Sequence, residues 1–463
     1  MRAWVAAAVL ATAAPAFGNG RPSETISINF RRGHDADVAC GMTFGFVVTH
    51  DNGATWRWMC EDALHYNGLF DPTYAYTEPG SIFATTFNGA LVNRDGCTFD
   101  ATAFGENAAV TTLAQGPDGA VYMGLDRTAT TTVPADPKLY VSTDDGATFP
   151  ISANPGQPSD WWESIRVAPS DPQRVYVSGF RVLPMQGRGH LLFRSDDGGH
   201  SYQPMGQTGL VATTNTTMQL VGVSATNPDV LYLHLDLIDP TNPDKTDDAI
   251  AKSTDGGATW TKILEKNATI YFLARANGDL VASTQLAGSS VSHDGGATWQ
   301  DLVNPPHINC LSENDAGEVW ACTANYHVEP TPMQVEIPSD GYGIMKSTDL
   351  ATWTPVLHFQ DILGPVDCPV GTVQRDSCVD REMLGTTNWC VTRSQLGVTE
   401  NPTCCPPMHD GEPVSPGCPD PGGGSDDDPS CCGTSSSSTN VPTALLSGVV
   451  IGGVLLRRRR RRA

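Results

Sequence analysis

The sequence has few basic residues. Its 463 residues include 28 Lys and Arg against 51 Asp and Glu, which gives a formal net charge of −23. A surface this negative repels nucleic acid and anionic membranes unless basic side chains cluster locally. No such cluster precedes the last seven residues, so nucleic acid is not expected as a partner.

Several motifs of catalysis and cofactor binding are also missing. The sequence has no G-x-S-x-G, no H-E-x-x-H and no G-x-x-x-x-G-K. Its histidines form no i, i+4 pair of the kind that binds a metal, and we expect no cofactor. One acidic loop offers carboxylates for calcium but lacks EF-hand spacing, so a solvated loop is the simpler interpretation. Its aspartates are Asp236, Asp239, Asp244, Asp247 and Asp248.

Long helical periodicity is absent from the central region. Aromatic residues make up only 8% of the chain, whereas 46 residues are Gly and 34 are Pro. This composition favours many short strands joined by turns over long helices. We therefore predict an all-β protein.

Both ends carry features typical of export. Residues 1–18 combine an early arginine, an apolar run and the small-residue site Ala14-Pro15-Ala16, which indicates a signal peptide. Residues 441–456 are apolar but short for a membrane span, and the tail 457–463 begins with six arginines, which favour a cytoplasmic end. Without its two ends, the chain carries a net charge of about −30.

The 13 cysteines of an exported chain point to disulfides. Cys310 and Cys322 flank a predicted hairpin turn at residues 314–317, so they are expected to pair across two strands. Cys60 is expected to pair next, with either Cys97 or Cys40.

A short motif recurs seven times before residue 360. The full form is S/T-x-D-x-G-x-T/S-aromatic, as in STDGGATW at residues 253–260, and two copies are one residue shorter. Successive motif aspartates lie 39 to 58 residues apart, which indicates one supersecondary unit per repeat. The aspartates are Asp51, Asp95, Asp144, Asp197, Asp255, Asp294 and Asp349.

The residue types of the motif are those of a hairpin turn. Asp accepts hydrogen bonds from backbone N–H groups just ahead of it, and Gly supplies a positive φ angle. The terminal aromatic residue starts the next strand and is expected to pack between adjacent sheets. These aromatic residues are Trp56, Phe99, Phe149, Tyr202, Trp260, Trp299 and Trp353.

The seven segments resemble Asp-boxes, the repeats of sialidases, sortilin-type receptors and related β-propellers. The resemblance implies one box in each four-stranded blade, at the turn between its third and fourth strands and away from the central binding site. The seven aspartates are then structural and not catalytic. Residues 19–362 are expected to form a propeller, with seven blades as the natural count.

The amino-acid composition of the chain changes after the expected propeller. Residues 363–422 are rich in Pro, Gly and Cys, which suits a small disulfide-stapled module, with zinc binding as the alternative. Residues 423–440 form a Gly-, Ser- and Asp-rich linker that contains Cys431 and Cys432. The order of cysteine, apolar segment and arginines resembles the myxobacterial C-terminal sorting tag, MYXO-CTERM. This resemblance implies display on the cell surface, with membrane attachment through the segment or a lipid-linked cysteine.

Two functions follow from this architecture. One is a propeller that binds a glycan or protein ligand at its central face or blade loops, and the other is a sialidase-like glycoside hydrolase. Sialidases hold the substrate carboxylate with three arginines and use a Tyr nucleophile, a Glu and an acid/base Asp.

The candidates for the hydrolase function are scattered along the chain. The sialidase motif F-R-x-P has its nearest match at residues 29–33, NFRRG, which lacks the proline. The candidate arginines are Arg31, Arg166, Arg181, Arg188 and Arg275, and the candidate acid/base residues are Asp35 and Asp37. Because the arginines are isolated and the N-terminal motif is incomplete, the sequence favours the binding function.

Overall fold

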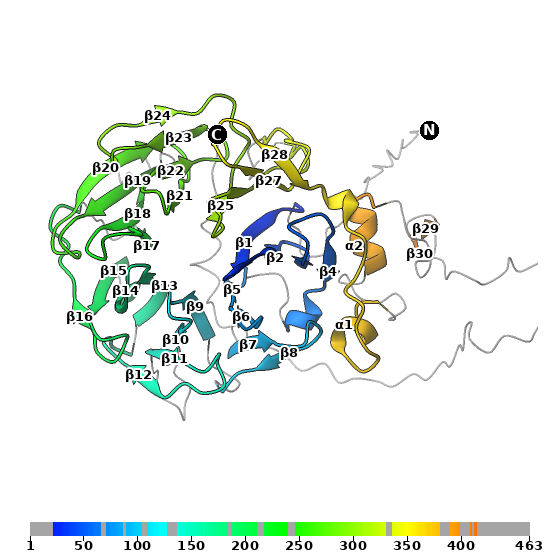
Figure 1. The fold of residues 1–463 in the computed structure, drawn as a ribbon, viewed down its shortest axis with the longest axis horizontal. Coiled ribbons are helices and arrows are strands. Elements are labelled where there is room, and N and C mark those ends of the chain that lie inside the picture. Colours follow the sequence, from blue (N-terminus) through cyan, green and yellow to red (C-terminus); the bar gives the residue numbers. More distant parts are fainter. Residues whose placement is uncertain are drawn as a thin grey trace, which may run out of the picture.

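The computed structural model describes residues 22–65, 71–86, 89–103, 109–126, 137–158, 160–183, 187–210, 217–238, 246–329, 336–379, 389–398, 408–409 and 412–413. Antiparallel sheets follow one another around a central axis, and the first sheet lies beside the last (Figure 1). This arrangement is an all-β propeller, as the sequence predicts.

Apart from a separate two-stranded hairpin, β29 (Met408–His409) and β30 (Glu412–Pro413), the described strands form seven successive four-strand meanders, called units 1 to 7. Five of the units are separate sheets. They are unit 1, β1 (Thr25–Arg31), β2 (His34–Met42), β3 (Gly45–Thr49) and β4 (Arg57–Met59); unit 4, β13 (Asp160–Ala168), β14 (Asp171–Leu183), β15 (Gly187–Ser195) and β16 (Gln203–Pro204); unit 5, β17 (Thr217–Val223), β18 (Leu231–Ile238), β19 (Thr246–Ser253) and β20 (Thr261–Lys266); unit 6, β21 (Tyr271–Ala274), β22 (Leu280–Ser283), β23 (Ser289–Ser292) and β24 (Gln300–Asp301); and unit 7, β25 (Cys310–Glu313), β26 (Val319–Cys322), β27 (Ile344–Ser347) and β28 (Thr354–Leu357).

Units 2 and 3 share one eight-stranded sheet, so the structure has five separate four-stranded blades and the prediction of seven four-stranded blades is wrong. Their strands are β5 (Tyr74–Tyr76), β6 (Ile82–Thr86), β7 (Gly89–Asn93), β8 (Phe99–Ala101), β9 (Ala109–Gln115), β10 (Val121–Asp126), β11 (Lys138–Ser142) and β12 (Ile151–Ala153). A single parallel pair, Gly89 with Ala109, joins β7 to β9. The small side chains of these two residues let the backbones approach to pairing distance at that point.

The meander topology gives the ring two chemically different faces. The turns between first and second strands and between third and fourth strands lie on one side, which we call the turn face. The loops between second and third strands and the connections between units lie on the other side, which we call the loop face. All seven motif aspartates lie between a third and a fourth strand and therefore belong to the turn face.

The core consists of apolar clusters between neighbouring units. For example, Tyr232 and Ile250 of unit 5 pack with Leu280 and Ala282 of unit 6. A larger cluster joins Phe46 and other residues of unit 1 to residues of units 2 and 7. Each sheet is therefore buried only when both of its neighbours are in place.

Four of the seven motif aromatic residues are buried in these interfaces, namely Trp56, Phe99, Tyr202 and Trp260. The other three, Phe149, Trp299 and Trp353, are half-buried. The indole N–H of Trp260 donates to the Gly206 carbonyl oxygen at 3.1 Å, and that of Trp299 donates to the Ile263 carbonyl oxygen at 2.9 Å. Gly206 lies in the connection from unit 4 to unit 5, which contains Trp260, and Ile263 lies in unit 5, next to the unit 6 that contains Trp299. The motif tryptophans therefore link successive units.

The ring closes without a strand shared between its two ends. The Thr25 hydroxyl donates to the Gly343 carbonyl oxygen at 2.9 Å, and the Phe30 and Trp320 rings meet edge to face at 5.3 Å. On the turn face, the Asp35 carboxylate accepts hydrogen bonds from the backbone N–H groups of Asp315 and Ala316. Units 1 and 7 are thus held by hydrogen bonds and packing.

The chain then returns across the outer edge of unit 1 as a segment that we call the clasp, residues 363–379. The Trp58 backbone N–H donates to the Gly364 carbonyl oxygen at 2.9 Å, and the Val366 N–H donates to the Trp58 carbonyl oxygen at 2.9 Å. The clasp therefore pairs with β4, the outermost strand of unit 1.

Two short helices and a buried glutamine fix the clasp. The clasp follows the 3₁₀ turn Phe359–Asp361, and a second 3₁₀ turn, Asp62–Leu64, follows β4. Gln374 of α1 (Val373–Asp376) is fully buried, donates to the Trp58 carbonyl oxygen and accepts from the Cys60 backbone N–H, both at 3.0 Å. Trp389 of α2 (Trp389–Gln395) packs on Trp58 with ring centroids 5.2 Å apart. Figure 1 shows α1 and α2 outside the ring next to β4.

The disulfides confirm one predicted pair and correct another. Cys310 and Cys322 are joined across β25 and β26, as the hairpin predicts. The predicted pairing of Cys60 with Cys97 or Cys40 is wrong, because Cys60 is bonded to Cys378 and Cys97 to Cys368. Cys40 is a free, buried thiol, and burial raises its pKa.

The predicted terminal segments lie outside the described residues. These are residues 1–18, 423–440, 441–456 and 457–463, together with the tag cysteines Cys431 and Cys432. The part of the chain that the structure describes contains no helix with the length and apolar character needed to cross a membrane.

The first prediction compares two motif tryptophans. Trp260 is 4% exposed, so Trp260→Ala should lower the free energy of unfolding by about 3–5 kcal/mol, whereas half-buried Trp299 should cost roughly half as much. Equilibrium unfolding in urea measures both values. Equal losses, or a loss at Trp260 below about 1 kcal/mol, would contradict the assigned packing.

The second prediction concerns the clasp. Replacing both Cys60 and Cys378 with Ser should cost about 2–5 kcal/mol, because the bond closes a loop that runs through the Cys97–Cys368 bond and contains about 47 residues, the difference between the two sequence separations of 318 and 271. The matched control, Cys310→Ser with Cys322→Ser, removes a bond that spans only 12 residues and should cost less. Chemical denaturation of both variants under oxidising conditions tests the order, and a larger loss in the control would refute it.

Candidate functional site

The seven motif aspartates hold the turns in which they lie. In the full-length motif, Asp255 accepts from the Ser253 hydroxyl at 2.8 Å, the Thr259 backbone N–H at 2.9 Å and the Thr259 hydroxyl at 2.6 Å. The Gly257 N–H donates in turn to the Ser253 hydroxyl, and Gly257 adopts a φ of +89°. The four other full-length motifs repeat the aspartate contacts to the backbone N–H and hydroxyl four residues ahead, at Asp51, Asp144, Asp197 and Asp294.

The two shorter motifs use backbone groups nearer to the aspartate. Asp95 accepts from the N–H groups of Cys97 and Thr98, and Asp349 accepts from those of Ala351 and Thr352. Since these carboxylates are occupied by their own turns, the arrangement supports a structural role.

The carboxylates of these turns have low pKa values because they accept hydrogen bonds. Hydroxyl donors, followed by backbone N–H groups, lower the pKa of Asp51, Asp144 and Asp255 from 3.8 to about 2. A hydrogen-bonded carboxylate resists protonation, so the turns keep their charge well below neutral pH.

The candidate residues near the N-terminus lie on the turn face. Arg31 ends β1, and its guanidinium contacts the Asp37 carboxylate at 2.9 Å, which also pairs with exposed His50 at 2.9 Å. Arg32 donates to the Gly116 carbonyl oxygen in unit 3. Asp35 bonds to unit 7, as described above. The resemblance to the sialidase arginine motif fails here, because it implies a position on the opposite face from the motif turns.

Arg275 also lies on the turn face, where β21 meets β22. Its guanidinium donates to the Glu313 carboxylate and to the Gly317 carbonyl oxygen, both at 2.8 Å, and joins unit 6 to unit 7. In the same unit, His293 pairs with Asp279 at 2.8 Å as His50 does with Asp37. These groups are occupied in contacts that hold the ring together.

The other two paired arginines lie on the loop face of unit 4. The Asp160 carboxylate, which is fully buried at the start of β13, accepts two hydrogen bonds from Arg181, at 2.6 and 2.8 Å. It also accepts from the Gln157 N–H at 2.7 Å. The charge of Arg181 is therefore neutralised by a bidentate pair.

Next to this pair lies an aromatic row that the sequence analysis did not single out. Trp161 on β13 and Phe180 on β14 are cross-strand partners with rings parallel to within 4° and centroids 6.3 Å apart. The Arg188 guanidinium lies 4.1 Å from the centre of the Phe180 ring and contacts the Glu163 carboxylate at 3.4 Å. We call Trp161, Glu163, Phe180 and Arg188 the unit 4 cluster.

A β-bulge shapes this cluster. The β13–β14 register shifts between Trp162 and Ser164, which leaves Glu163 as the extra residue. Gly179, the partner of Trp162, permits the bulge because a Cβ there would lie 2.1 Å from the Trp161 carbonyl oxygen. Because successive strand residues point to opposite sides of a sheet, Trp162 packs in the core with units 3 and 4, while Trp161 lies outside all of the apolar clusters found in the described residues.

Arg166 lies further along β13, the innermost strand of unit 4. Its guanidinium donates to the Ile165 carbonyl oxygen at 2.9 Å, and burial lowers its pKa to about 10. The candidate arginines therefore divide between two faces and the interior of the ring, so the described residues contain no convergent set of three.

Two imidazole–carboxylate pairs lie toward the loop face in units 5 and 7. His234 contacts the buried Asp248 carboxylate at 2.8 Å, and His307 contacts Asp340 at 2.8 Å. Asp248 also accepts from the Ile270 N–H. Of the proposed calcium residues, Asp239 and Asp244 lie outside the described part of the chain, within which no three His, Cys, Asp or Glu side chains form a metal site.

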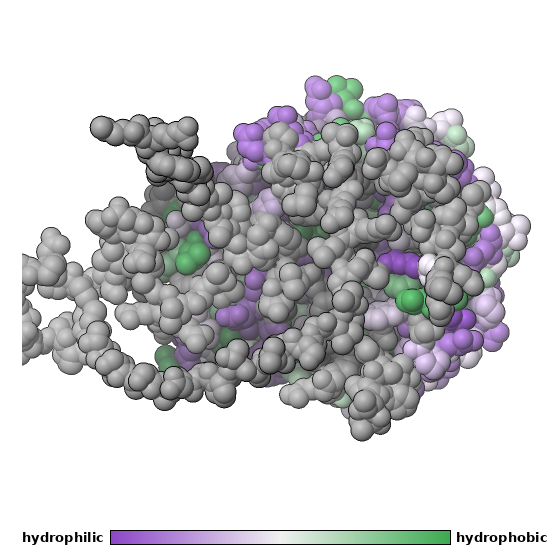
Figure 2. All heavy atoms as spheres, turned by 180° about the vertical axis from the view of Figure 1, so that it is seen from behind, coloured by the Kyte–Doolittle hydropathy of each residue, from purple (hydrophilic) through white to green (hydrophobic). Residues whose placement is uncertain are grey.

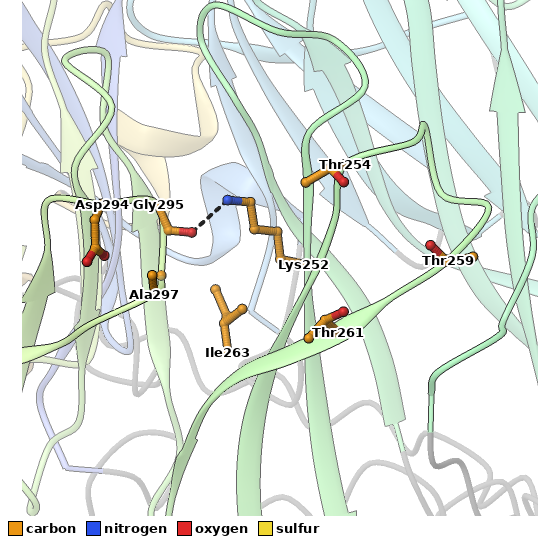
Figure 3. A pocket seen from close by; sticks show the side chains of 9 residues that line it. Lys252, Thr254, Thr259, Thr261, Ile263, Asp294, Gly295 and Ala297 are labelled. Carbon is orange, nitrogen blue, oxygen red and sulfur yellow. Dashed lines mark hydrogen bonds between the residues drawn. The ribbon is translucent and has the colours of Figure 1, made fainter.

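A cleft of about 260 Å³ opens between the outer strands of unit 5 and the motif turn of unit 6 (Figure 3). Lys252 reaches across it and donates to the Gly295 carbonyl oxygen at 2.7 Å. Threonines and Ile263 form the rest of its wall. The cleft is thus an interface between two motif turns, with its only cationic lining residue engaged by backbone.

Six large hydrophobic residues are exposed among those that the structure describes. Seen from behind, hydrophilic and hydrophobic residues are mixed along its rim (Figure 2). These exposed residues are scattered singly or in small groups along the chain, namely Val182, Leu286, Val303, Leu363, Val370 and Val373. The polar contacts of unit 4 therefore offer more specific chemistry than any apolar patch.

No family model matches this sequence, and no curated protein matches it significantly. Similar solved structures include an ancestral GH74 enzyme, 13% identical with a TM-score of 0.49 over 73% of this chain and 55% of that chain. They also include a Hadza microbial sialidase, which is 15% identical with a TM-score of 0.36 over 60% of this chain and 66% of that chain. An α-L-arabinanase of Penicillium chrysogenum is 11% identical with a TM-score of 0.38 over 65% of this chain and 89% of that chain. The chain spans about half the length of the GH74 enzyme. With identities this low and scores below 0.5, these likenesses do not carry an activity over to this chain.

The third prediction follows from the low pKa values of the motif aspartates. Because the folded pKa lies below the unfolded value, the stability that ionised Asp255 contributes is complete above about pH 4 and is lost as the pH falls toward 2. The difference in unfolding midpoint between wild type and Asp255→Asn should therefore be large at pH 6 and shrink near pH 2. Urea titrations at both pH values, with Asp100→Asn as an exposed control, measure it; a difference independent of pH would contradict the assignment.

Proposed function

We propose that this chain is an exported, surface-displayed propeller that binds a glycan ligand through its loop face and does not hydrolyse it. The observation that carries the proposal is the separation of the arginines. Arg31 and Arg275 are engaged on the turn face, whereas Arg181 and Arg188 lie on the loop face. A sialidase-like site needs three such groups around one substrate carboxylate.

Charge supports the same proposal. A formal net charge of −23 disfavours anionic sugars unless arginines are concentrated to overcome the field. Of the loop-face arginines that the structure describes, Arg181 and Arg188 are each bonded to a carboxylate, which leaves little positive potential there for an anionic substrate. A loop-lined propeller face binds ligands without any catalytic group.

The proposal extends to the location of the chain. The tag-like C-terminus and the signal-like N-terminus support export and attachment to the cell surface. The clasp adds disulfides, which persist in an oxidising compartment.

The fourth prediction is saturable binding without turnover. The purified full-length chain is incubated with a panel of sialosides and neutral oligosaccharides, and binding and hydrolysis are measured on the same samples. We expect binding of at least one member and no product above the uncatalysed rate. Turnover that is abolished by replacing one loop-face Arg or a Tyr would establish the hydrolase function instead.

A further inference from the structure

We propose that the unit 4 cluster is a subsite for an uncharged saccharide ring, with Trp161 as the stacking surface. This inference rests on the proposed binding function and names the ligand class and the residues that recognise it. The cluster consists of Trp161, Glu163, Phe180 and Arg188, as defined above.

Trp161 is placed where a ligand of the loop face reaches it. It is the second residue of β13, the innermost strand of unit 4, at the end that emerges on the loop face. It is half-buried, and none of the apolar clusters in the described residues includes it or Phe180. Its packing therefore contributes little to the apolar core clusters, and its backbone carbonyl oxygen lies close to Gly179 of the neighbouring strand.

The aromatic row is rigid before any ligand arrives. Phe180 holds the Trp161 ring nearly parallel to its own on the neighbouring strand, and Arg188 covers Phe180 from the third strand at 4.1 Å. Aromatic side chains with few rotatable bonds give up little conformational entropy on binding. The apolar face of a pyranose ring matches such a flat surface.

Polar groups next to the ring suit hydroxyls better than a charged ligand. Arg188 contacts Glu163, and Arg181 is bound bidentately by Asp160, so each guanidinium already has a carboxylate partner. Gln219 from unit 5 reaches the Glu163 carbonyl oxygen at 3.4 Å and extends the polar border. An anionic sugar would have to compete with Glu163 and Asp160 for the arginines, whereas a neutral sugar uses donors and acceptors without breaking an ion pair.

A protein ligand fits this surface less well. Specific protein interfaces bury about 1,200–2,000 Å² and contain an apolar centre. Around the cluster, Val182 is the large hydrophobic residue that is exposed, and the other exposed ones lie in different units or in the clasp. The surface therefore favours a small, polar ligand with one flat apolar side.

The fifth prediction tests the subsite by calorimetric titration of the full-length chain. The probes are cellohexaose and laminarihexaose as neutral oligosaccharides and sialyllactose as an anionic one. We expect a neutral probe to bind and Trp161→Ala to weaken its binding roughly tenfold, which corresponds to the loss of one stacking contact. Trp161→Phe should restore most of the affinity.

The matched control is Tyr342→Ala, which removes a half-buried aromatic side chain from the loop face of unit 7. This variant should bind the neutral probe as wild type does, and thermal unfolding of all variants shows that each is folded. Unchanged binding in folded Trp161→Ala would overturn the subsite while leaving the binding function intact.

Two other outcomes would overturn the subsite, and a third would overturn only the non-catalytic function. Preference for sialyllactose over both neutral probes would show that the ligand class is wrong. Cross-linking of a protein through a photoreactive residue at position 182, without saccharide binding, would assign the surface to a protein. Turnover of a neutral probe would overturn the non-catalytic function. If Trp161→Ala then lost both binding and turnover, the unit 4 cluster would still be assigned as the saccharide subsite.

Discussion

Closure of the ring is the constraint on which the rest of the structure depends. Each sheet has two apolar faces, and each face is buried only by a neighbouring unit, so the first unit must meet the last. Packing of Phe30 on Trp320 and hydrogen bonds from Thr25 and to Asp35 make this contact. The clasp then reinforces it from outside, where Gln374 satisfies backbone groups on either side of Met59 and two disulfides fix the returning chain.

The two faces of the ring have separate tasks because of the strand order. On the turn face, carboxylates are occupied by the turns that they hold, and Arg31 and Arg275 bind neighbouring carboxylates. Because these charged groups are already engaged, few of them are available on the turn face to recognise a ligand. The loop face carries the connections between units and the unit 4 cluster, so aromatic surface and paired charges meet on that side.

Local parts of this structure could be predicted from the sequence, and distant contacts could not. The recurring motif carries its own hydrogen bonds within about five residues, so the turns and the meanders around them follow from spacing. The bond between Cys310 and Cys322 follows in the same way from one hairpin. By contrast, Cys60 meets Cys378 only because the clasp crosses unit 1, and no local pattern reports that path. The merging of units 2 and 3 into one sheet depends on the single pair of Gly89 with Ala109, which no local pattern in the sequence indicates.

The candidate site was missed for a related reason. Arginines were sought as a set, yet strand direction sends Arg31 and Arg188 to opposite faces. The adjacent Trp161 and Trp162 look alike in the sequence, but neighbouring residues of a strand point to opposite sides of the sheet, and only Trp162 joins an apolar core cluster. A pair of tryptophans at the start of a strand was the available signal, but its meaning required the register.

The covalent path of the clasp has one more consequence. Because Cys60 is bonded to Cys378, a sequence separation of 318, the chain between them forms a closed covalent loop, and the bond between Cys97 and Cys368 closes a second loop inside it. Hydrolysis of any single peptide bond within the inner loop leaves the two fragments joined by both disulfides. A chain nicked once in an exposed connection would therefore separate on a gel only after reduction, while its sheets stay side by side.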